Sequence, residues 1–379
     1  MSQDLFIELL QVALGTRSEL SLVPSNSQWE ALLELAQMQA VEGVLLCGIE
    51  RLPKEQRPPM DILMQWFGRA HIIESHNGEM TKTCVSVCER FVEDGYRICV
   101  LKGQANRVYY PAEIGKRRPC GDVDVWVKVM SDGSCKKDDI KQVLKYVKSK
   151  HGLTGLCWLH CKFEDKSGVS VEVHFHPSFM NEPIHNRRFQ RYFADFDSCV
   201  TYKEIEGKKI PALRVEKDVI YQMNHIYRHL LDEGIGLRQI IDYFCCLRNY
   251  SIHLKKGIRS KEETIRIVKW LGMRRFAGAL MWVLQVVCGM SSENLLCQPV
   301  EKDGKFLMNE IMMSGNFGQS DPRMGELNTS SVMKYRLTRA WRRFKRNIRF
   351  VSSYPSEVAW EPFARLYHFA WKKLKLYNC

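Results

Sequence analysis

Three carboxylic acids on two alternating segments are the residues of this chain whose types and spacing best suit chemistry. The run DVDVWVKV puts Asp122 and Asp124 on one face of a strand and four valines on the other. A second run, 169–176, alternates in the same way and separates Glu172 from its apolar residues. Same-face neighbours on a strand lie roughly 6–7 Å apart. The three acids therefore converge if the two strands lie side by side.

A converged set of acids predicts a divalent cation. Carboxylates in a partly shielded site repel one another unless a cation neutralises them, and oxygen ligands of this kind select Mg²⁺ or Mn²⁺. The alternative is a solvated acidic face, because acidic residues are mostly exposed in proteins. The alternation of the residues alone does not decide between these two hypotheses.

Histidines accompany the acids. His174 and His176 share the strand face of Glu172. There His174 either orients Glu172, contacts a substrate or belongs with His176 to a polar sheet face. A second pair, His225 and His229, is four residues apart on a predicted helix but lacks the glutamate of a zinc-protease helix. That pair is either a ligand contact or a pair of satisfied core histidines.

The sequence patterns around these residues predict an α+β fold. The run RICVLKG predicts a short strand and a turn, and strands follow near 158–164 and 169–176 with a DKSG turn between them. Apolar residues at three- and four-residue intervals predict helices before Tyr96 and beyond Pro211. The expected fold is a small mixed sheet flanked by helices. In chain order, we expect an N-terminal helical region (1–95), an α/β core (96–210), a C-terminal helical domain (211–330) and a basic amphipathic tail (331–379).

Composition excludes several classes of protein. The 379 residues are 45% hydrophobic and 26% charged, which is typical of globular proteins and rules out wholesale disorder. No window approaches the ~18–20 uninterrupted apolar residues needed to cross a bilayer. The first segment is typical of an amphipathic helix rather than of a secretion signal. Because the fourteen cysteines are dispersed, mostly in apolar stretches, we expect reduced thiols and a cytoplasmic protein.

The excess of positive charge is concentrated near the end of the chain. The sequence has 56 Lys and Arg against 43 Asp and Glu, and twelve of the basic residues fall between Lys334 and Lys375, against two acids. An apolar row recurs there at helical spacing: Leu337, Trp341, Phe344 and Ile348. This basic amphipathic helix binds a polyanion, rests on an anionic membrane surface or packs its apolar row on the protein body. The last is the commonest arrangement of amphipathic helices.

Three motifs resemble those of the polymerase-β-like nucleotidyltransferase superfamily. They are LKG at 101–103, GDVDVWV at 121–127 and VEVHFHP at 171–177. The chain looks closest to the bacterial uncharacterised nucleotidyltransferase family, and segments on both sides of the motifs are similar to that family as well. The resemblance covers nearly the whole chain.

The resemblance implies metal-dependent transfer of a nucleotidyl group. Asp122, Asp124 and Glu172 would hold Mg²⁺ or Mn²⁺ beside a nucleoside triphosphate, expected to be ATP. Glu172 would also be the candidate general base. An NMP group would pass to a hydroxyl or phosphate acceptor, which the sequence does not identify, with release of pyrophosphate.

The same resemblance assigns the turn at Lys102, Gly103 and Gln104 to the triphosphate, because Gly103 lets backbone amides approach it. The superfamily usually has glycine followed by glycine or serine, whereas this chain has glycine followed by glutamine. Lys102, Arg117 and Arg118 would supply the phosphate contacts that this turn lacks. Alternatively, the two arginines lie in a solvated loop.

The main rival hypothesis is a catalytically inactive module that keeps the fold and uses its basic tail to bind nucleic acid or a partner protein. The presence of all three expected carboxylates favours the enzyme. A third hypothesis is a phosphotransferase with similar metal chemistry, which would release ADP in place of pyrophosphate.

Overall fold

The computed structural model describes residues 2–130, 136–255, 260–324 and 331–374. It divides the chain into two compact units, each built from two separate chain segments. Unit 1 contains residues 1–70 and 222–360, and unit 2 contains residues 71–221 and 361–379. These units cut across the four consecutive regions outlined from the sequence, because segments distant in the chain pack together. Lys375, the last residue of the basic run, lies outside the described residues.

Unit 1 is built from helices within the described ranges. They are α1 (Ser2–Leu14), α2 (Asn26–Met38), α3 (Glu42–Arg51), α11 (Leu237–Lys255), α12 (Lys261–Trp270), α13 (Arg274–Cys288), α14 (Glu301–Ser314) and α15 (Val332–Phe350). Gln39 shows how its two chain segments are joined. This fully buried side chain donates to the carbonyl of Ile311 at 3.2 Å and accepts from the backbone N–H of Leu237 at 2.9 Å. A buried amide with both ends bonded fixes the helices around it.

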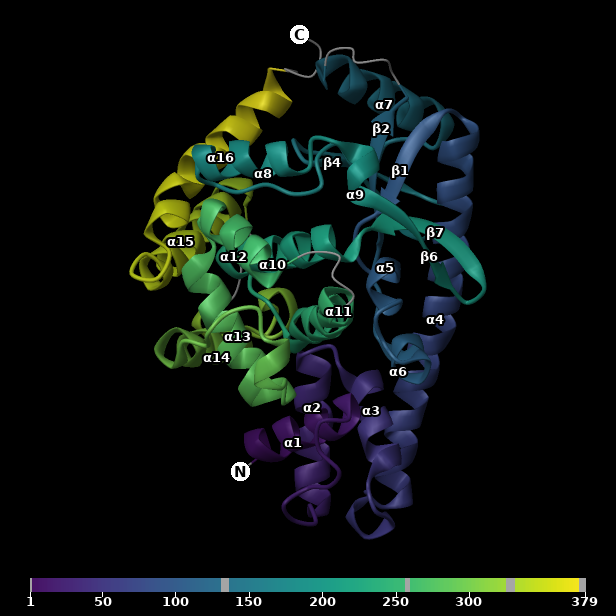
Figure 1. The fold of residues 1–379 in the computed structure, drawn as a ribbon, viewed down its shortest axis with the longest axis vertical. Helices are drawn as coiled ribbons and strands as arrows, with labels where there is room; N and C mark the ends of the chain where they lie inside the picture. Colours follow the sequence, from purple (N-terminus) through teal and green to yellow (C-terminus); the bar gives the residue numbers. More distant parts are fainter. Residues whose placement is uncertain (1, 131–135, 256–259, 325–330, 375–379) are drawn as a thin grey trace. The chain divides into compact units, whose positions relative to one another are not determined.

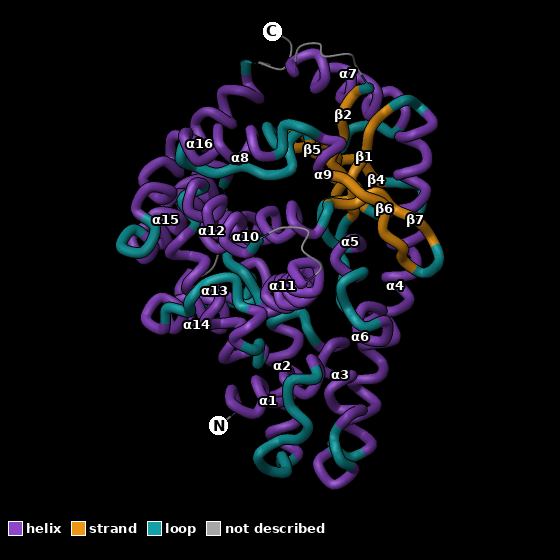
Figure 2. The backbone as a smooth tube through the Cα atoms, in the orientation of Figure 1, coloured by secondary structure: helices purple, strands orange, loops and turns teal. Residues whose placement is uncertain are grey.

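Unit 2 is built around a mixed sheet of seven strands in the order β3-β4-β5-β2-β1-β7-β6 (Figure 2). The strands are β1 (Tyr96–Val100), β2 (Val123–Val129), β3 (Gly155–Leu156), β4 (His160–Glu164), β5 (Ser170–His174), β6 (Val200–Ile205) and β7 (Lys208–Leu213). β2 is antiparallel to β1 and parallel to β5. The predicted α+β class with a mixed sheet and flanking helices is confirmed.

Further helices complete the fold (Figure 1). Unit 2 contains α5 (Gln104–Arg107), α6 (Ala112–Arg117), α7 (Lys136–Lys150), α8 (Pro183–Tyr192) and α9 (Phe196–Cys199). The chain passes between the units within α4 (Met60–Glu93), α10 (Val215–Asp232) and α16 (Pro355–Lys373). None of the helices in the described ranges combines the length and the hydropathy that a membrane span requires. The twelve cysteines in those ranges are all free thiols.

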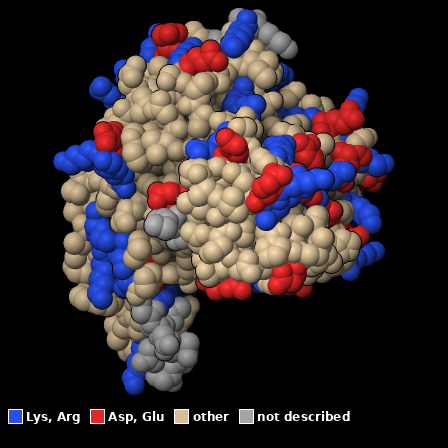
Figure 3. Space-filling view, turned by 90° about the horizontal axis from the view of Figure 1, so that it is seen from below, with Lys and Arg blue, Asp and Glu red and all other residues tan. Residues whose placement is uncertain are grey.

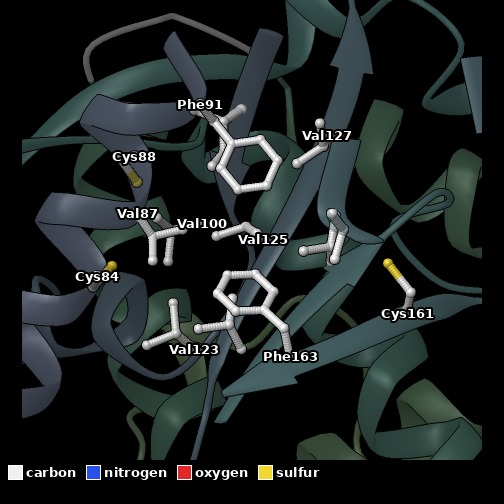
Figure 4. Packing of buried hydrophobic residues seen from close by; sticks show 14 of the residues in the cluster. Cys84, Val87, Cys88, Phe91, Val100, Val123, Val125, Val127, Cys161 and Phe163 are labelled. Atoms are coloured by element: carbon white, nitrogen blue, oxygen red, sulfur yellow. The ribbon is translucent and has the colours of Figure 1, made fainter. Parts of the chain in front are cut away.

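One face of the sheet carries the core of unit 2. Figure 4 shows Val87 and Phe91 of α4 beside Val123, Val125 and Val127 of β2, and all five side chains are buried. Helix α7 contributes buried residues to the same cluster. The valine face that the sequence predicts is therefore the core face, and the acids of β2 must point to the other side of the sheet.

The opposite face is also covered near the acids. The ring of Trp126 lies 4.5 Å from that of Phe196 and 6.4 Å from that of Phe193, measured between centroids. Because α8 ends beside Phe193 and α9 begins at Phe196, these two helices shield the strand face that carries Asp124. Asp124 shares this face of β2 with Trp126 and has no exposed surface, so this part of the face is covered.

Candidate functional site

The parallel pairing of β2 and β5 brings the acids together. In this register Asp124 lies directly opposite Glu172, and Asp122 stands one residue before β2 begins. One carboxylate oxygen from each of Asp122, Asp124 and Glu172 lies within 4.8 Å of the other two. Three anionic ligands at this spacing match the oxygen set that Mg²⁺ and Mn²⁺ prefer.

Asp124 is the most deeply buried of the three acids. Its side chain has no exposed surface, whereas that of Asp122 is 35% exposed. Burial raises the pKa of Asp124 to about 6, and the negative charge of Asp122 adds to this rise. Asp124 therefore does not belong to a solvated acidic face. A buried carboxylate with a raised pKa gains from a nearby cation.

Lys102 supplies a cation from the chain itself. Its Nζ lies 3.1 Å from Oδ2 of Asp124 and 3.7 Å from Oδ2 of Asp122. Burial on its own lowers the pKa of Lys102, but the attraction of Asp124, Asp122 and Glu172 outweighs this effect and raises the pKa above its ordinary value. The lysine is therefore charged and neutralises part of the acid cluster.

His174 links two of the acids. Its Nε2 lies 3.0 Å from Oδ1 of Asp124 and 3.5 Å from Oε2 of Glu172. Burial alone lowers the pKa of this imidazole, but hydrogen bonds to Asp124 and then to Glu172 give a net rise. One buried ring thus holds both carboxylates in position.

Two residues of β4 join the site although sequence reasoning did not select them. β4 pairs antiparallel with β5, which places Lys162 opposite Glu172 and His160 opposite His174. Lys162 donates to Oε1 of Glu172, and Nδ1 of His160 lies 3.3 Å from Oε2 of the same residue. The alternation of HCKFE could have identified them, since Cys161 and Phe163 face the core.

These cations determine the charge state of Glu172. Burial raises its pKa, but the hydrogen bond from His174 and the positive charges of His160 and Lys102 give a net pKa well below the ordinary range. Glu172 is therefore ionised over the whole neutral range. It belongs to a second possible ligand set, because one ligand atom from each of His160, Glu172 and His174 also lies within 4.8 Å of the others.

The turn after β1 is connected to the acid strand through the backbone. The N–H of Leu101 donates to the carbonyl of Asp124 at 2.9 Å. Gly103 has φ +62° and ψ −103°, a conformation that L side chains rarely adopt, and a Cβ there would lie 3.4 Å from the carbonyl oxygen of Asp122. Gln104 is buried and accepts from Nη1 of Arg107 at 2.8 Å. The turn therefore places Lys102 against the acids while Gln104 points into the fold.

Arg117, the last residue of α6, and Arg118, which follows it, have partners outside the acid cluster. Nε of Arg117 donates to Glu74 of α4 at 2.6 Å. Arg118 is buried, and its Nη1 donates to the carbonyl of Pro119 at 2.7 Å. The two arginines therefore do not lie in a solvated loop. Neither of these contacts joins an arginine to the three acids.

The other three histidines that the sequence singled out have packing partners. The ring of His176 stacks on Trp158 with centroids 4.7 Å apart. In unit 1 the rings of His225 and His229 lie 4.3 Å apart, and Nδ1 of His229 lies 2.6 Å from Oε1 of Glu233. These contacts fit a structural role for all three side chains.

Comparisons with known proteins bear on this site. Residues 25–289 match the model of a family described as uncharacterised nucleotidyltransferase. A search of curated proteins finds no match. Among solved structures, an antigenic nucleotidyltransferase-like protein from Paracoccidioides brasiliensis is similar at 19% identity and a TM-score of 0.30, over 44% of this chain and 75% of that chain. The family match contains all the acids, lysines and histidines of the site.

Proposed function

The chain belongs to the uncharacterised nucleotidyltransferase family, and we propose that it transfers a nucleotidyl group from a nucleoside triphosphate, preferably ATP, to a hydroxyl or phosphate acceptor. The observation that carries this proposal is the parallel pairing of β2 with β5, which gathers Asp122, Asp124 and Glu172 within ligand distance. Family membership supports this class of reaction, and the three acids are the candidate site for it.

In the proposed reaction an acceptor oxygen forms a bond to the α-phosphorus of the triphosphate. The bond from that phosphorus to the oxygen bridging the α- and β-phosphates breaks, pyrophosphate leaves with that electron pair, and the acceptor proton passes to water. Asp122, Asp124 and Glu172 would hold Mg²⁺ or Mn²⁺. When bound, the metal would lower the pKa of the acceptor hydroxyl and offset charge on the phosphates.

We assign Glu172 to metal holding rather than to proton abstraction. A general base works best when its pKa is near the working pH, and the pKa of Glu172 is held well below that range. His174 would fix the orientation of Asp124 and Glu172 through its two contacts. A ligand carboxylate that stays ionised and oriented lowers the cost of binding the cation.

Phosphate contacts in this proposal come from the two lysines of the site. The side chain of Lys162 is 41% exposed and that of Lys102 is 18% exposed, and both ammonium groups lie against the acids. Gly103 would contribute through its backbone. Nε of Arg117 and Nη1 of Arg118 have partners outside the acid cluster, so the proposal takes its phosphate contacts from the lysines.

Binding of Mn²⁺ and a non-hydrolysable ATP analogue to the full chain tests the proposal without knowledge of the acceptor. We expect Mn²⁺-dependent thermal protection by the analogue, lost in Asp122→Asn/Asp124→Asn and retained in Asp197→Asn. Asp197 is a matched control because it is an exposed acid that pairs with Arg97. Equal protection of the double variant and the natural chain contradicts the proposal.

The rival hypotheses give different results in the same preparation. Nucleic-acid binding that is sensitive to salt and unaffected by Asp122→Asn/Asp124→Asn, without nucleotide protection, supports the inactive module. Once an acceptor is found, release of pyrophosphate supports nucleotidyl transfer, and release of ADP supports a phosphotransferase.

A further inference from the structure

Helix α15 turns an apolar row away from the unit to which it belongs. The side chains of the row are between 54% and 71% exposed: Met333, Leu337, Trp341, Phe344 and Ile348. At about 100° per residue they fall within roughly 80° of the helix circumference. A surface helix of a globular protein normally directs such a stripe at the core. The alternative in which this row packs on the body of unit 1 is therefore not what the structure shows.

The opposite side of α15 is the side that packs. Arg346 donates to the backbone carbonyls of Asp232 and Glu233. Phe350 is 1% exposed, and its ring lies 5.6 Å from that of Phe306 between centroids. Burial lowers the pKa of Arg346 to about 10. Arg346 and Phe350 thus pack against the rest of unit 1, whereas the side chains of the apolar row remain exposed.

A second anchor holds the same side. Nη2 of Arg349 lies 3.6 Å from Oε2 of Glu310 and 3.8 Å from Oδ2 of Asp321. Arg323 binds both of these acids, with its Nη1 at 2.7 Å from Glu310 and its Nε at 2.8 Å from Asp321. This network fixes the rotation of α15 about its axis. The outward direction of the apolar row is therefore a built feature of unit 1.

The charge of α15 has one sign. The helix contains eight Lys and Arg and no Asp or Glu, whereas α16, which also exposes apolar side chains, contains two glutamates. Lys334 and Lys345 are exposed and border the apolar row, and Nζ of Lys345 lies 5.6 Å from the ring centroid of Trp341. Figure 3 shows a band of Lys and Arg side chains along the left edge of the face that it draws.

We propose that α15 is a membrane-surface helix that docks the protein on an anionic lipid bilayer. The apolar row would enter the boundary between headgroups and acyl chains, with Trp341 at the headgroup level, while Lys334 and Lys345 reach the lipid phosphates. The combination of an outward apolar row, an indole, cationic borders and no acid is the one that anionic bilayers select. The proposal is independent of catalysis, and α15 lies outside the family match at 25–289.

Other occupants fit these observations less well. A second copy of α15 facing the first would bring two helices of the same sign together, with no acid on either to offset the repulsion. Nucleic acid would satisfy the cations, but Met333, Leu337 and Ile348 would gain little from phosphates and would remain in water. A bilayer accepts both the charges and the apolar side chains.

Vesicle co-sedimentation of the full chain tests the proposal. The probes are vesicles of phosphatidylcholine alone and vesicles with 30% phosphatidylserine. We expect at least tenfold tighter binding to the anionic vesicles in 0.1 M NaCl, and a large loss in 1 M NaCl, where the Debye length falls from about 10 Å to about 3 Å. Leu337→Ser/Phe344→Ser should weaken binding at least tenfold, and Lys334→Glu/Lys345→Glu should remove the preference for anionic lipid.

Met60→Ser/Met64→Ser is the matched control. These residues of unit 1 are 69% and 59% exposed, close to the 65% and 54% of Leu337 and Phe344, so the loss of exposed apolar surface is similar. We expect this control to bind as the natural chain does. Unchanged binding of Leu337→Ser/Phe344→Ser overturns the proposal, and so does equal or absent binding to both kinds of vesicle. Loss of a dimer or of RNA binding in that variant, with no vesicle binding by the natural chain, overturns it in favour of another partner.

Discussion

The ammonium of Lys102 lies 3.1 Å from a carboxylate oxygen of Asp124, a side chain with no exposed surface. Burial disfavours the charged form of that carboxylate, and the lysine offsets part of the cost. A divalent cation bound by Asp122 and Asp124 would meet the same ammonium. The lysine is thus an internal counter-ion of the two acids, which it would share with a bound metal.

Replacing this counter-ion should make the fold depend on metal. Lys102→Met leaves buried acids without their nearest cation, so we expect the free energy of unfolding at pH 7.5 to fall by about 3 kcal/mol in the absence of metal. Mn²⁺ should recover more stability in this variant than in the natural chain. Urea unfolding with and without Mn²⁺ measures both effects. Lys162→Met is the control, because its side chain is 41% exposed and its loss should cost about 1 kcal/mol or less.

Asp124 should give the metal-free protein a specific dependence on pH. Its pKa is raised to about 6 in the folded state from an ordinary value of 3.8, so the folded state binds the proton more tightly than the unfolded state. The resulting stabilisation is complete below about pH 4 and is lost as the pH rises through 6. Relative to Asp124→Asn, the natural chain should therefore lose about 2–3 kcal/mol of unfolding free energy between pH 4 and pH 7. Urea unfolding of both proteins across this range measures the difference, and a constant difference contradicts the assignment.

Strict alternation made much of this sheet predictable. β1, β2, β4 and β5 lie where the sequence predicts strands, because apolar residues at every second position bury one face of β2, β4 and β5, and β1 is a short run rich in strand-forming residues. The hairpin of β6 (Val200–Ile205) and β7 (Lys208–Leu213) was not predicted. Its turn at Glu206-Gly207 joins VTYKEI and KKIPAL, in which charged residues stand side by side and Pro211 interrupts the second segment, so neither shows a clear alternation.

The counter-ions of the site were harder to predict than its acids. The convergence of Asp124 and Glu172 follows from two local patterns and one pairing. The contact of Lys162 with Glu172 depends on the register of the β4–β5 pairing, which alternation within β4 does not give on its own. The outward direction of the apolar row of α15 could not be predicted for a similar reason. The periodicity shows that the helix has an apolar stripe, but it does not show which side of the helix packs on the rest of unit 1.

The ligand set that contains imidazole nitrogens, His160, Glu172 and His174, should affect which metal the site prefers. Imidazole nitrogen favours zinc and cobalt over magnesium, so His160→Gln should weaken binding of Co²⁺ about tenfold and change binding of Mg²⁺ less than threefold. Isothermal titration of the metal-free protein with each ion gives both constants. His185→Gln is the control, because His185 also lies beside a carboxylate, with Nδ1 at 3.4 Å from Glu182, outside the two ligand sets. Equal weakening of both ions by His160→Gln shows that His160 only supports Glu172.

A side chain at Gly103 should damage the site more than the fold. The φ of +62° makes alanine strained there by about 1–3 kcal/mol, and its Cβ would lie 3.4 Å from the carbonyl oxygen of Asp122. Relief of this strain moves the turn that carries Lys102, so we expect Gly103→Ala to weaken Mn²⁺ binding at least fivefold. Gly95→Ala also places a side chain at positive φ, +83°, but has nothing within 4 Å of the added Cβ. It should lower the melting temperature to a similar extent and leave Mn²⁺ binding unchanged. Titration with Mn²⁺ and thermal melts of both variants test this prediction. Equal Mn²⁺ affinities in the two variants would show that the turn at Gly103 does not contribute to metal binding.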